Sequence, residues 1–315
     1  ARARSMDDDT LRRQLPDSIA ARLRSLKQTD GRVIAVLDAT GLTADARDGL
    51  EAAVKDILGA QAGVSDVRVA MMADKPQRTI IAVGSGKGGV GKSTLTANLA
   101  VALSRLGRKV GLVDADIYGP SQPTILGNAG EKPTAHDEKL VPVSTRWGVP
   151  VLSMGYLVEA GKALAWRGPM AGNALGQLVD AHWGEAEFIL IDLPPGTGDV
   201  QLSMLQKHKP AGAVIVSTPQ DLALIDAQRA MQLFETGGVP ILGLVENMAG
   251  YACPHCGEVS DPFGQGGVEA AAGALKLPFL GRIPLTIAIR QAGDAGTPPA
   301  AGDGPEADAF RTIAL

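Results

Sequence analysis

The sequence of 315 residues predicts an α/β protein with a doubly wound, mostly parallel sheet and a small α+β domain in front of it. From Thr79 onward, short β-branched runs alternate with segments of helical periodicity. A glycine-rich phosphate-binding pattern lies between the first of these runs and the helical segment that follows it. Aromatic residues make up only 3% of the chain, so aliphatic side chains must fill the core. That composition is typical of a parallel sheet buried on both faces.

The small N-terminal domain is expected to cover residues 1–75. Its expected elements are a helix over Leu11–Leu26, a strand over Arg32–Leu37, a helix capped by Thr43 and a strand over Val67–Met71. Residues 74–78 contain a proline and are expected to link this domain to the large domain, residues 76–315.

The large domain is expected to contain seven strands separated by helices. They are Thr79–Val83, Val110–Asp114, Val149–Ser153, Phe188–Asp192, Ala213–Ser217, Ile241–Glu246 and Phe279–Gly281. Ligands of such sheets bind beyond the carboxyl ends of the strands. The polar residues that follow these strands are therefore the candidate site residues.

The first strand leads into Gly84–Thr94, which reads GSGKGGVGKST and matches G-x-x-x-x-G-K-[ST]. Glycines let successive backbone N–H groups face an anion, and the following helix adds its positive end. Lys92 supplies a charge for the β- and γ-phosphates, and Ser93 offers a hydroxyl to Mg²⁺. The residues expected to bind the nucleotide here are Gly86, Lys87, Gly88, Gly89, Val90, Gly91, Lys92, Ser93 and Thr94.

Acidic residues end two further strands. Asp114 and Asp116 follow one, and Asp192 ends a strand of four apolar residues in the Walker B arrangement, which indicates a place near Mg²⁺. An isolated Asp-x-Asp could also be a polar strand cap. Beside a phosphate-binding loop, however, such carboxylates orient water or hold Mg²⁺.

The strand over Ile241–Glu246 is followed by Asn247, whose amide can pair with the donor and acceptor edge of adenine. The chain lacks the N/T-K-x-D pattern typical of guanine recognition. These two observations favour ATP over GTP.

The only two cysteines, Cys253 and Cys256, form one C-x-x-C pair. A redox pair is one interpretation, but it requires the first cysteine at a helix N-terminus. A single zinc ion would need more ligands than two thiolates and perhaps His255. Two chains together offer four thiolates, which suits a [4Fe–4S] cluster or zinc on a two-fold axis. His136, His182 and His208 show no partners at ligand spacing and are expected to be surface or structural residues.

The formal net charge of −4 argues against general affinity for nucleic acid or anionic membranes. No run reaches the ~18 apolar residues that span a bilayer. The first residues lack the apolar stretch of a secretory signal. We therefore expect a cytoplasmic protein without nucleic-acid or membrane partners.

Six stretches within residues 79–292 resemble the Mrp/ApbC/Nbp35 family of iron–sulfur cluster carrier ATPases, which has the deviant P-loop of the MinD/ParA/nitrogenase-reductase class. They are GKGGVGKST, DADIYGPS, WRGPM at residues 166–170, IDLPPGTGD, STPQDLALID and NMAGYACPHCG. The resemblance implies ATP hydrolysis and a homodimer. It also implies a labile cluster at the cysteine pair that is handed to apo iron–sulfur proteins.

The resemblance also implies roles for single residues. Lys87, otherwise an exposed charge beside a phosphate, would reach the nucleotide of the partner chain. Asp116 would orient or activate the attacking water, Asp114 would support the Mg²⁺ network, and Asn247 would contact adenine. The N-terminal domain resembles, weakly, a module found in front of related carriers, and recruitment is a hypothesis for it.

The alternative is a positioning ATPase of the MinD/ParA type that acts on membrane or DNA. A MinD-like protein would need a basic amphipathic C-terminal helix. Residues 302–308 are instead acidic and interrupted by proline. The cluster carrier is therefore favoured.

Overall fold

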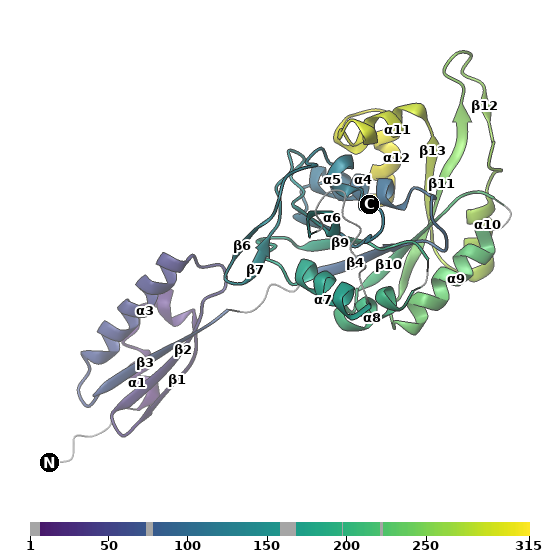
Figure 1. Ribbon diagram of the computed structural model, residues 1–315. Helices are drawn as coiled ribbons and strands as arrows, with labels where there is room; N and C mark the ends of the chain where they lie inside the picture. Colours follow the sequence, from purple (N-terminus) through teal and green to yellow (C-terminus); the bar gives the residue numbers. More distant parts are fainter. Residues whose placement is uncertain (1–6, 74–77, 158–167, 197, 221–222) are drawn as a thin grey trace. The chain divides into compact units, whose positions relative to one another are not determined.

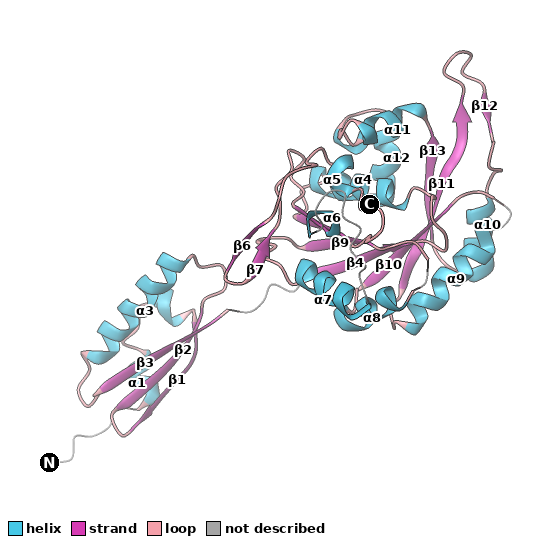
Figure 2. Cartoon of the chain, in the orientation of Figure 1, coloured by secondary structure: helices cyan, strands magenta, loops and turns pink. Residues whose placement is uncertain are grey.

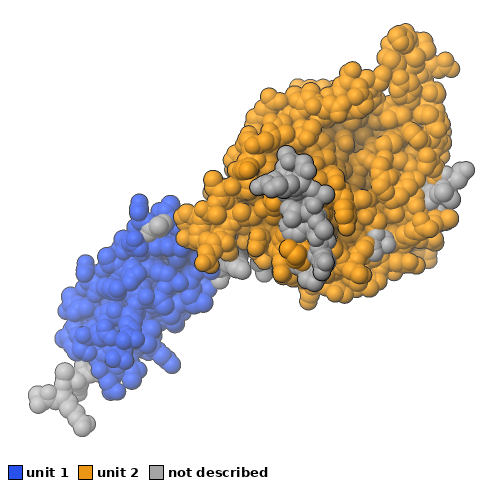
Figure 3. Space-filling view, in the orientation of Figure 1, with its two compact units in different colours: residues 1–77 blue, residues 78–315 orange. Residues whose placement is uncertain are grey.

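The computed structural model describes residues 7–73, 78–157, 168–196, 198–220 and 223–315. The chain forms two compact units, Ala1–Gln77 and Arg78–Leu315 (Figure 3). The expected linker lies almost entirely outside the described residues.

Unit 1 corrects one expected element. The predicted helix over Leu11–Leu26 is wrong, because the chain forms α1 (Asp8–Arg12), α2 (Asp17–Ala20) and β1 (Leu23–Thr29). Pro16 lies between the two short helices, where its ring and missing N–H end a continuous helix. Asp30 and Gly31 both have positive φ, 49° and 78°, and form a two-residue turn into β2 (Arg32–Asp38).

The rest of unit 1 follows the expected pattern. Thr43 accepts a hydrogen bond from the N–H of Ala46 and caps α3 (Ala44–Gly59). β2 then pairs in parallel with β3 (Asp66–Met72), which gives a three-stranded sheet in the order β1-β2-β3. Nine buried apolar side chains form a core between this sheet and its helices: Leu11, Leu15, Ile19, Leu23, Val33, Ala35, Leu37, Val54 and Leu58.

Unit 2 is built on an eight-stranded sheet with the strand order β12-β11-β10-β4-β9-β5-β8, in which β13 also pairs with β11 (Figure 2). All of these pairs are parallel except that of β12 with β11. The strands are β4 (Thr79–Gly84), β5 (Val110–Asp114), β8 (Val151–Ser153), β9 (Phe188–Asp192), β10 (Gly212–Ser217), β11 (Ile241–Ala252), β12 (Val259–Ser260) and β13 (Phe279–Leu285). β6 (Thr134–His136) and β7 (Lys139–Val141) form a separate hairpin.

Helices cover both faces of the sheet (Figure 1). On one side lie α4 (Lys92–Arg105), α5 (Gln122–Ile125), α11 (Ile287–Asp294) and α12 (Pro305–Ala314), and on the other α7 (Gly168–Val179), α8 (Asp199–His208), α9 (Ala223–Thr236) and α10 (Gly267–Leu275). The short α6 (Met154–Leu157) and a 3₁₀ turn over Pro299–Ala301 complete the unit. Two apolar clusters, one on each face, fill the interior. This arrangement confirms the predicted fold class.

Two strands extend beyond their expected ends: β13 continues to Leu285, whereas we expected it to end at Gly281. β11 continues to Ala252 and turns back through β12, whereas we expected it to end at Glu246. Among the described residues, no helix has both the length and the apolar character required to cross a bilayer.

Candidate functional site

The phosphate-binding loop joins β4 to α4 at the carboxyl edge of the sheet and borders a cavity of about 470 Å³. The loop lines this cavity with Ser85, Lys87, Gly88, Gly89, Val90, Gly91, Lys92, Ser93 and Thr94. Asp116 lines it from the segment after β5, and Arg290 and Asp294 line it from α11. The structure therefore gathers the P-loop residues and Asp116 around one cavity at the N-terminus of a helix, where backbone N–H groups favour an anion.

Two glycines of the loop are required by close approach. A Cβ at Gly86 would lie 2.1 Å from the carbonyl oxygen of Asp226 in α9. A Cβ at Gly91, which also has a φ of +80°, would lie 2.1 Å from Nδ2 of Asn247. The pattern of glycines thus fits both the loop backbone and the elements packed against it.

Polar residues of the loop, of β9 and of α5 meet beneath the loop. Lys92 Nζ contacts Asp192 Oδ1 and lies 3.5 Å from Ser93 Oγ. Gln122 Nε2 donates to Asp192 Oδ2 at 2.8 Å and to the carbonyl oxygen of Ser93 at 3.0 Å. The predicted Walker B carboxylate is therefore held beside the P-loop lysine and serine.

Asp114 lies on the neighbouring strand and is completely buried. Its carboxylate accepts hydrogen bonds from Ser153 Oγ at 2.9 Å and from the N–H groups of Gln122 and Asp116. Burial, together with the negative charge of Asp192, raises the pKa of Asp114 to about 7. Two carboxylates buried side by side repel one another, so the site favours a cation.

Asp116 is half-buried at the cavity. Its Oδ1 accepts from the N–H groups of Tyr118 and Gly119 at 3.0 and 3.1 Å. These two bonds fix the orientation of the carboxylate at the rim. A fixed carboxylate that borders the cavity is suitably placed to orient water.

Lys87 lies against its own chain. Its Nζ is 2.8 Å from Oε1 of Gln220 and 3.2 Å from Oδ2 of Asp226, whose side chain is only 7% exposed. The expected reach of Lys87 across a dimer would therefore require these contacts to break.

Asn247 braces the P-loop. Its Nδ2 donates to the carbonyl oxygen of Val90 at 2.8 Å, and its side chain is not part of the cavity wall described above. One end of the amide is thus engaged by the loop, which leaves the amide oxygen for any contact with a base.

The cysteine pair lies in the turn of the β11–β12 hairpin, which projects from the sheet (Figure 1). The N–H of Cys253 donates to the carbonyl oxygen of Glu258 at 2.9 Å, and the N–H of Gly257 donates to that of Cys253 at 2.8 Å. The N–H groups of Cys256 and His255, and then the Cys256 thiol, hold the pKa of Cys253 below its usual value. Backbone donors directed at a sulfur stabilise the thiolate, which is the form that binds metal.

This geometry bears on the alternative interpretations of the pair. The next described helix, α10, begins only at Gly267, so Cys253 is not at a helix N-terminus. Among the described residues, the two sulfurs do not join any His, Asp or Glu in a group of three ligands. Cys253 is half-buried and Cys256 is exposed, so both remain accessible.

Sequence reasoning missed several residues of the site. Gln122 and Ser153 hold the two buried carboxylates, but neither belongs to a motif. Gln122 is the first residue of α5, eight positions after Asp114, and Ser153 is the last residue of β8. Arg290 and Asp294 lie far along the chain on α11. Of the quoted stretches, Trp166, Arg167, Thr197, Asp221 and Leu222 lie outside the described residues.

The fold and the loop geometry define the class: this chain is a P-loop NTPase. The septum site-determining protein MinD with Mg-ADP from Pyrococcus horikoshii aligns with a TM-score of 0.57 and 28% identity, covering 76% of this chain and 95% of that chain. A nucleotide-binding protein in complex with ADP from Archaeoglobus fulgidus, with cobalt found in it, aligns with a TM-score of 0.61 and 44% identity, covering 70% of this chain and 86% of that chain.

Sequence comparison narrows the class to a family. The family model described as "NUBPL iron-transfer P-loop NTPase", in the ParA group, matches residues 77–315. The iron-sulfur cluster carrier protein of Pseudomonas fragi is 48% identical over 229 residues, 72% of this chain and 79% of that protein. The iron-sulfur protein required for NADH dehydrogenase of Arabidopsis thaliana mitochondria is 50% identical over 224 residues, 70% of this chain and 71% of that protein. The chain belongs to the NUBPL iron-transfer P-loop NTPase family, which confirms the resemblance found in its sequence.

Proposed function

We propose that this protein is an ATP-hydrolysing carrier that binds a [4Fe–4S] cluster between two copies of the chain and transfers it to apo iron–sulfur proteins. The observation that carries the proposal is the β11–β12 turn, where two accessible cysteines, one with a lowered pKa, have no third protein ligand among the described residues. A Cys₄ cluster then needs two chains. A two-fold axis would bring the two pairs together.

The P-loop would hold the triphosphate. Backbone N–H groups from Gly86 to Thr94 would surround the phosphate oxygens, and Lys92 would contact the β- and γ-phosphates. Since Lys92 contacts Asp192 in this structure, phosphate binding would exchange one anionic partner of Lys92 for another.

The residues fit a magnesium ion. Ser93 Oγ and the carboxylate of Asp192 would hold it, and Asp114 would support it through the network that Gln122 and Ser153 form. The pKa of Asp114 is raised to about 7 by burial and by the nearby charge of Asp192. A bound divalent cation would offset the repulsion between these two carboxylates. When bound, such an ion neutralises charge on the transferred phosphoryl group.

Asp116 would orient the attacking water, because its carboxylate is held at the cavity rim. Lys87 would leave Asp226 and Gln220 and contact the nucleotide of the partner chain, which couples hydrolysis to dimer closure. Asn247 would present its amide oxygen to adenine while its nitrogen keeps the P-loop in place.

Anaerobic reconstitution with iron and sulfide tests the proposal. We expect about four irons and four sulfides per two chains, little zinc, and an absorbance band typical of a cluster. The double variant Cys253→Ser/Cys256→Ser should lose the cluster and keep ATP binding. Cluster loading that survives this change would disprove the assignment.

A further inference from the structure

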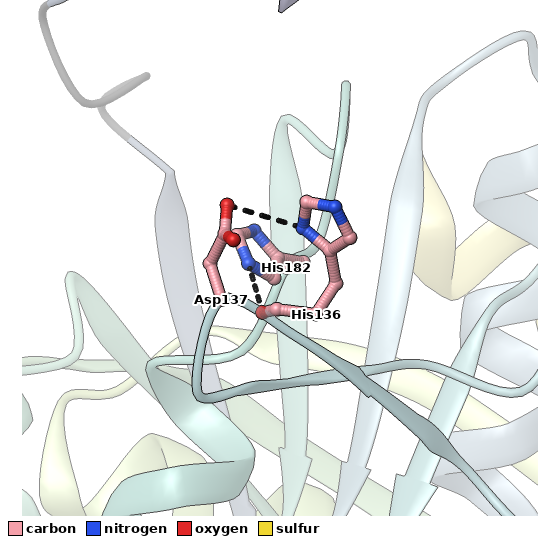
Figure 4. A group of neighbouring side chains, drawn as sticks. All are labelled: His136, Asp137 and His182. Atoms are coloured by element: carbon pink, nitrogen blue, oxygen red, sulfur yellow. Dashed lines mark hydrogen bonds and ion pairs between the residues drawn. The ribbon is translucent and has the colours of Figure 1, made fainter.

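A second group of metal-ligand side chains lies away from both sites. His136, Asp137 and His182 each place one ligand atom within 4.8 Å of the others (Figure 4). Spacing along the sequence does not reveal this group, since we expected His136 and His182 to lack partners at ligand spacing. That expectation is wrong because the fold brings together residues 46 positions apart.

The backbone positions the three residues. His136 ends β6, and Asp137 occupies the two-residue turn to β7 with a φ of +48°. The N–H of His182 donates to the carbonyl oxygen of Leu140 in β7 at 2.8 Å. The segment after α7 is therefore attached to the hairpin that carries the other two ligands.

The ring of His182 is oriented for coordination. Its Nε2 lies 2.9 Å from the carbonyl oxygen of His136, and because a carbonyl only accepts, Nε2 must donate its proton. In the neutral ring the other nitrogen, Nδ1, then carries a lone pair. Histidine ligands of metals generally donate their second N–H to a carbonyl or carboxylate in this way.

The other two ligands face the same space. His136 Nδ1 lies 3.2 Å from Asp137 Oδ2, and the two imidazole rings meet edge to face with centroids 5.8 Å apart. Figure 4 shows the Asp137 carboxylate and both rings directed toward one another. All three side chains are exposed, so small rotations can bring the ligand atoms to the roughly 3.3 Å separation around a tetrahedral zinc ion.

We propose that His136, Asp137 and His182 form a binding site for a divalent transition ion of the zinc type. Two imidazoles and one carboxylate suit Zn²⁺ better than Mg²⁺ or Ca²⁺, which prefer all-oxygen ligands. Three protein ligands leave one tetrahedral position for water or an incoming ligand. The ion would join the β6–β7 hairpin to the segment between α7 and β9.

The test uses the full-length chain without a histidine tag, in the Cys253→Ser/Cys256→Ser background, so that thiolates do not compete for the ion. Calorimetric titration with Zn²⁺ should show about one ion per chain. The double substitution His136→Ala/His182→Ala in this background should weaken Zn²⁺ binding by roughly tenfold or more. Asp137→Asn, which tolerates the same left-handed backbone, should weaken it by a smaller factor.

Glu138→Gln is the matched control, because Glu138 shares the turn and its positive φ but is not among the three ligands. It should bind Zn²⁺ as the parent does. Cobalt absorption provides a second readout, with a d–d band that the histidine variants lose. Equal zinc affinity in the double histidine variant would overturn the proposal. An equal loss of zinc affinity in Glu138→Gln would also overturn it, since binding would then depend on the negative charge of the turn and not on the three ligands.

Discussion

At the scale of single residues, the contacts of Lys87 bear on the dimer role that we propose for it. Its amine contacts Gln220 and Asp226 of its own chain, at the edge of the cavity that Lys92 and Ser93 line. If Lys87 contacts the nucleotide of a partner chain, as proposed, it must leave these two partners. Its effect on activity should therefore appear together with an effect on assembly.

We predict that Lys87→Ala lowers ATP hydrolysis by roughly 10²-fold or more and abolishes ATP-dependent dimerisation, while ADP binding is retained. Sedimentation and phosphate release measure the two effects. Lys132→Ala, an exposed lysine outside the cavity, is the control. A Lys87→Ala protein that still dimerises and hydrolyses ATP at the normal rate would contradict the role proposed for this lysine.

The raised pKa of Asp114 leads us to expect that the stability of unit 2 depends on pH. Its pKa is about 7 when folded and about 3.9 in an unfolded chain, so between these values the folded state binds more protons. The free energy of unfolding must then fall as pH rises from about 4 to about 7, by an amount on the order of 2–4 kcal/mol.

We predict that Asp114→Asn removes most of this decline. Urea unfolding at pH 5 and pH 8, followed by tryptophan fluorescence, measures it, because the three tryptophans of the chain all belong to unit 2. The same decline in both proteins would show that other groups cause it. If Asp114 supports a magnesium network, as proposed, the variant should also hydrolyse ATP more slowly.

At the scale of elements, α12 is part of the core of unit 2. It packs on α4 and β13, and its Phe310 is only 1% exposed. The expectation of an acidic, proline-interrupted end missed this helix: Pro305 lies in its first turn, where the absent N–H costs nothing. The apolar face of α12 covers the sheet and is not presented to a membrane surface.

Phe310→Ala should lower the free energy of unfolding of unit 2 by about 3–5 kcal/mol, because it leaves a large cavity between α12 and the sheet. Leu315→Ala, at a side chain that is 89% exposed, should change it by less than about 0.5 kcal/mol. Denaturant titration compares the two variants. If both variants changed the free energy of unfolding by a similarly small amount, the packing of α12 would contribute little to the stability of unit 2.

At the scale of the whole molecule, the chain contains two units with separate hydrophobic cores. All predicted ATP and cluster residues belong to unit 2. Unit 1 has its own three-stranded sheet, and we propose that it recruits partners rather than taking part in the chemistry.

We predict that a fragment of residues 78–315 binds ATP and loads a cluster as the full chain does, but transfers it more slowly to an apo-protein. Nucleotide titration and reconstitution measure the first two properties, and the appearance of activity in a recipient measures the third. Failure of the fragment to bind ATP would show that unit 1 supports the nucleotide site.

The class of fold and the position of the phosphate-binding loop could both be predicted from the sequence. The features that predict the loop are set by residues close together in sequence, because glycine conformation and helix periodicity depend on neighbouring residues. They are the pattern Gly86–Ser93, the strand before it and the helix after it. The acids after β5 and β9 were predicted for a similar reason, because the carboxyl ends of parallel strands share one edge. Local reasoning failed at Leu11–Leu26, where Pro16 interrupts the helix and the residues from Leu23 onward pair with β2.

Contacts between segments far apart in the chain could not be predicted from the sequence and appear only in the folded structure. It placed Asn247 against Val90, 157 residues away, and Lys87 against Gln220, 133 residues away. It also brought His136 and His182 together and placed the two cysteines in the turn of the β11–β12 hairpin. Such contacts form because burial of the apolar sheet fixes where each segment lies. No local pattern in either segment predicts which distant segment will lie beside it.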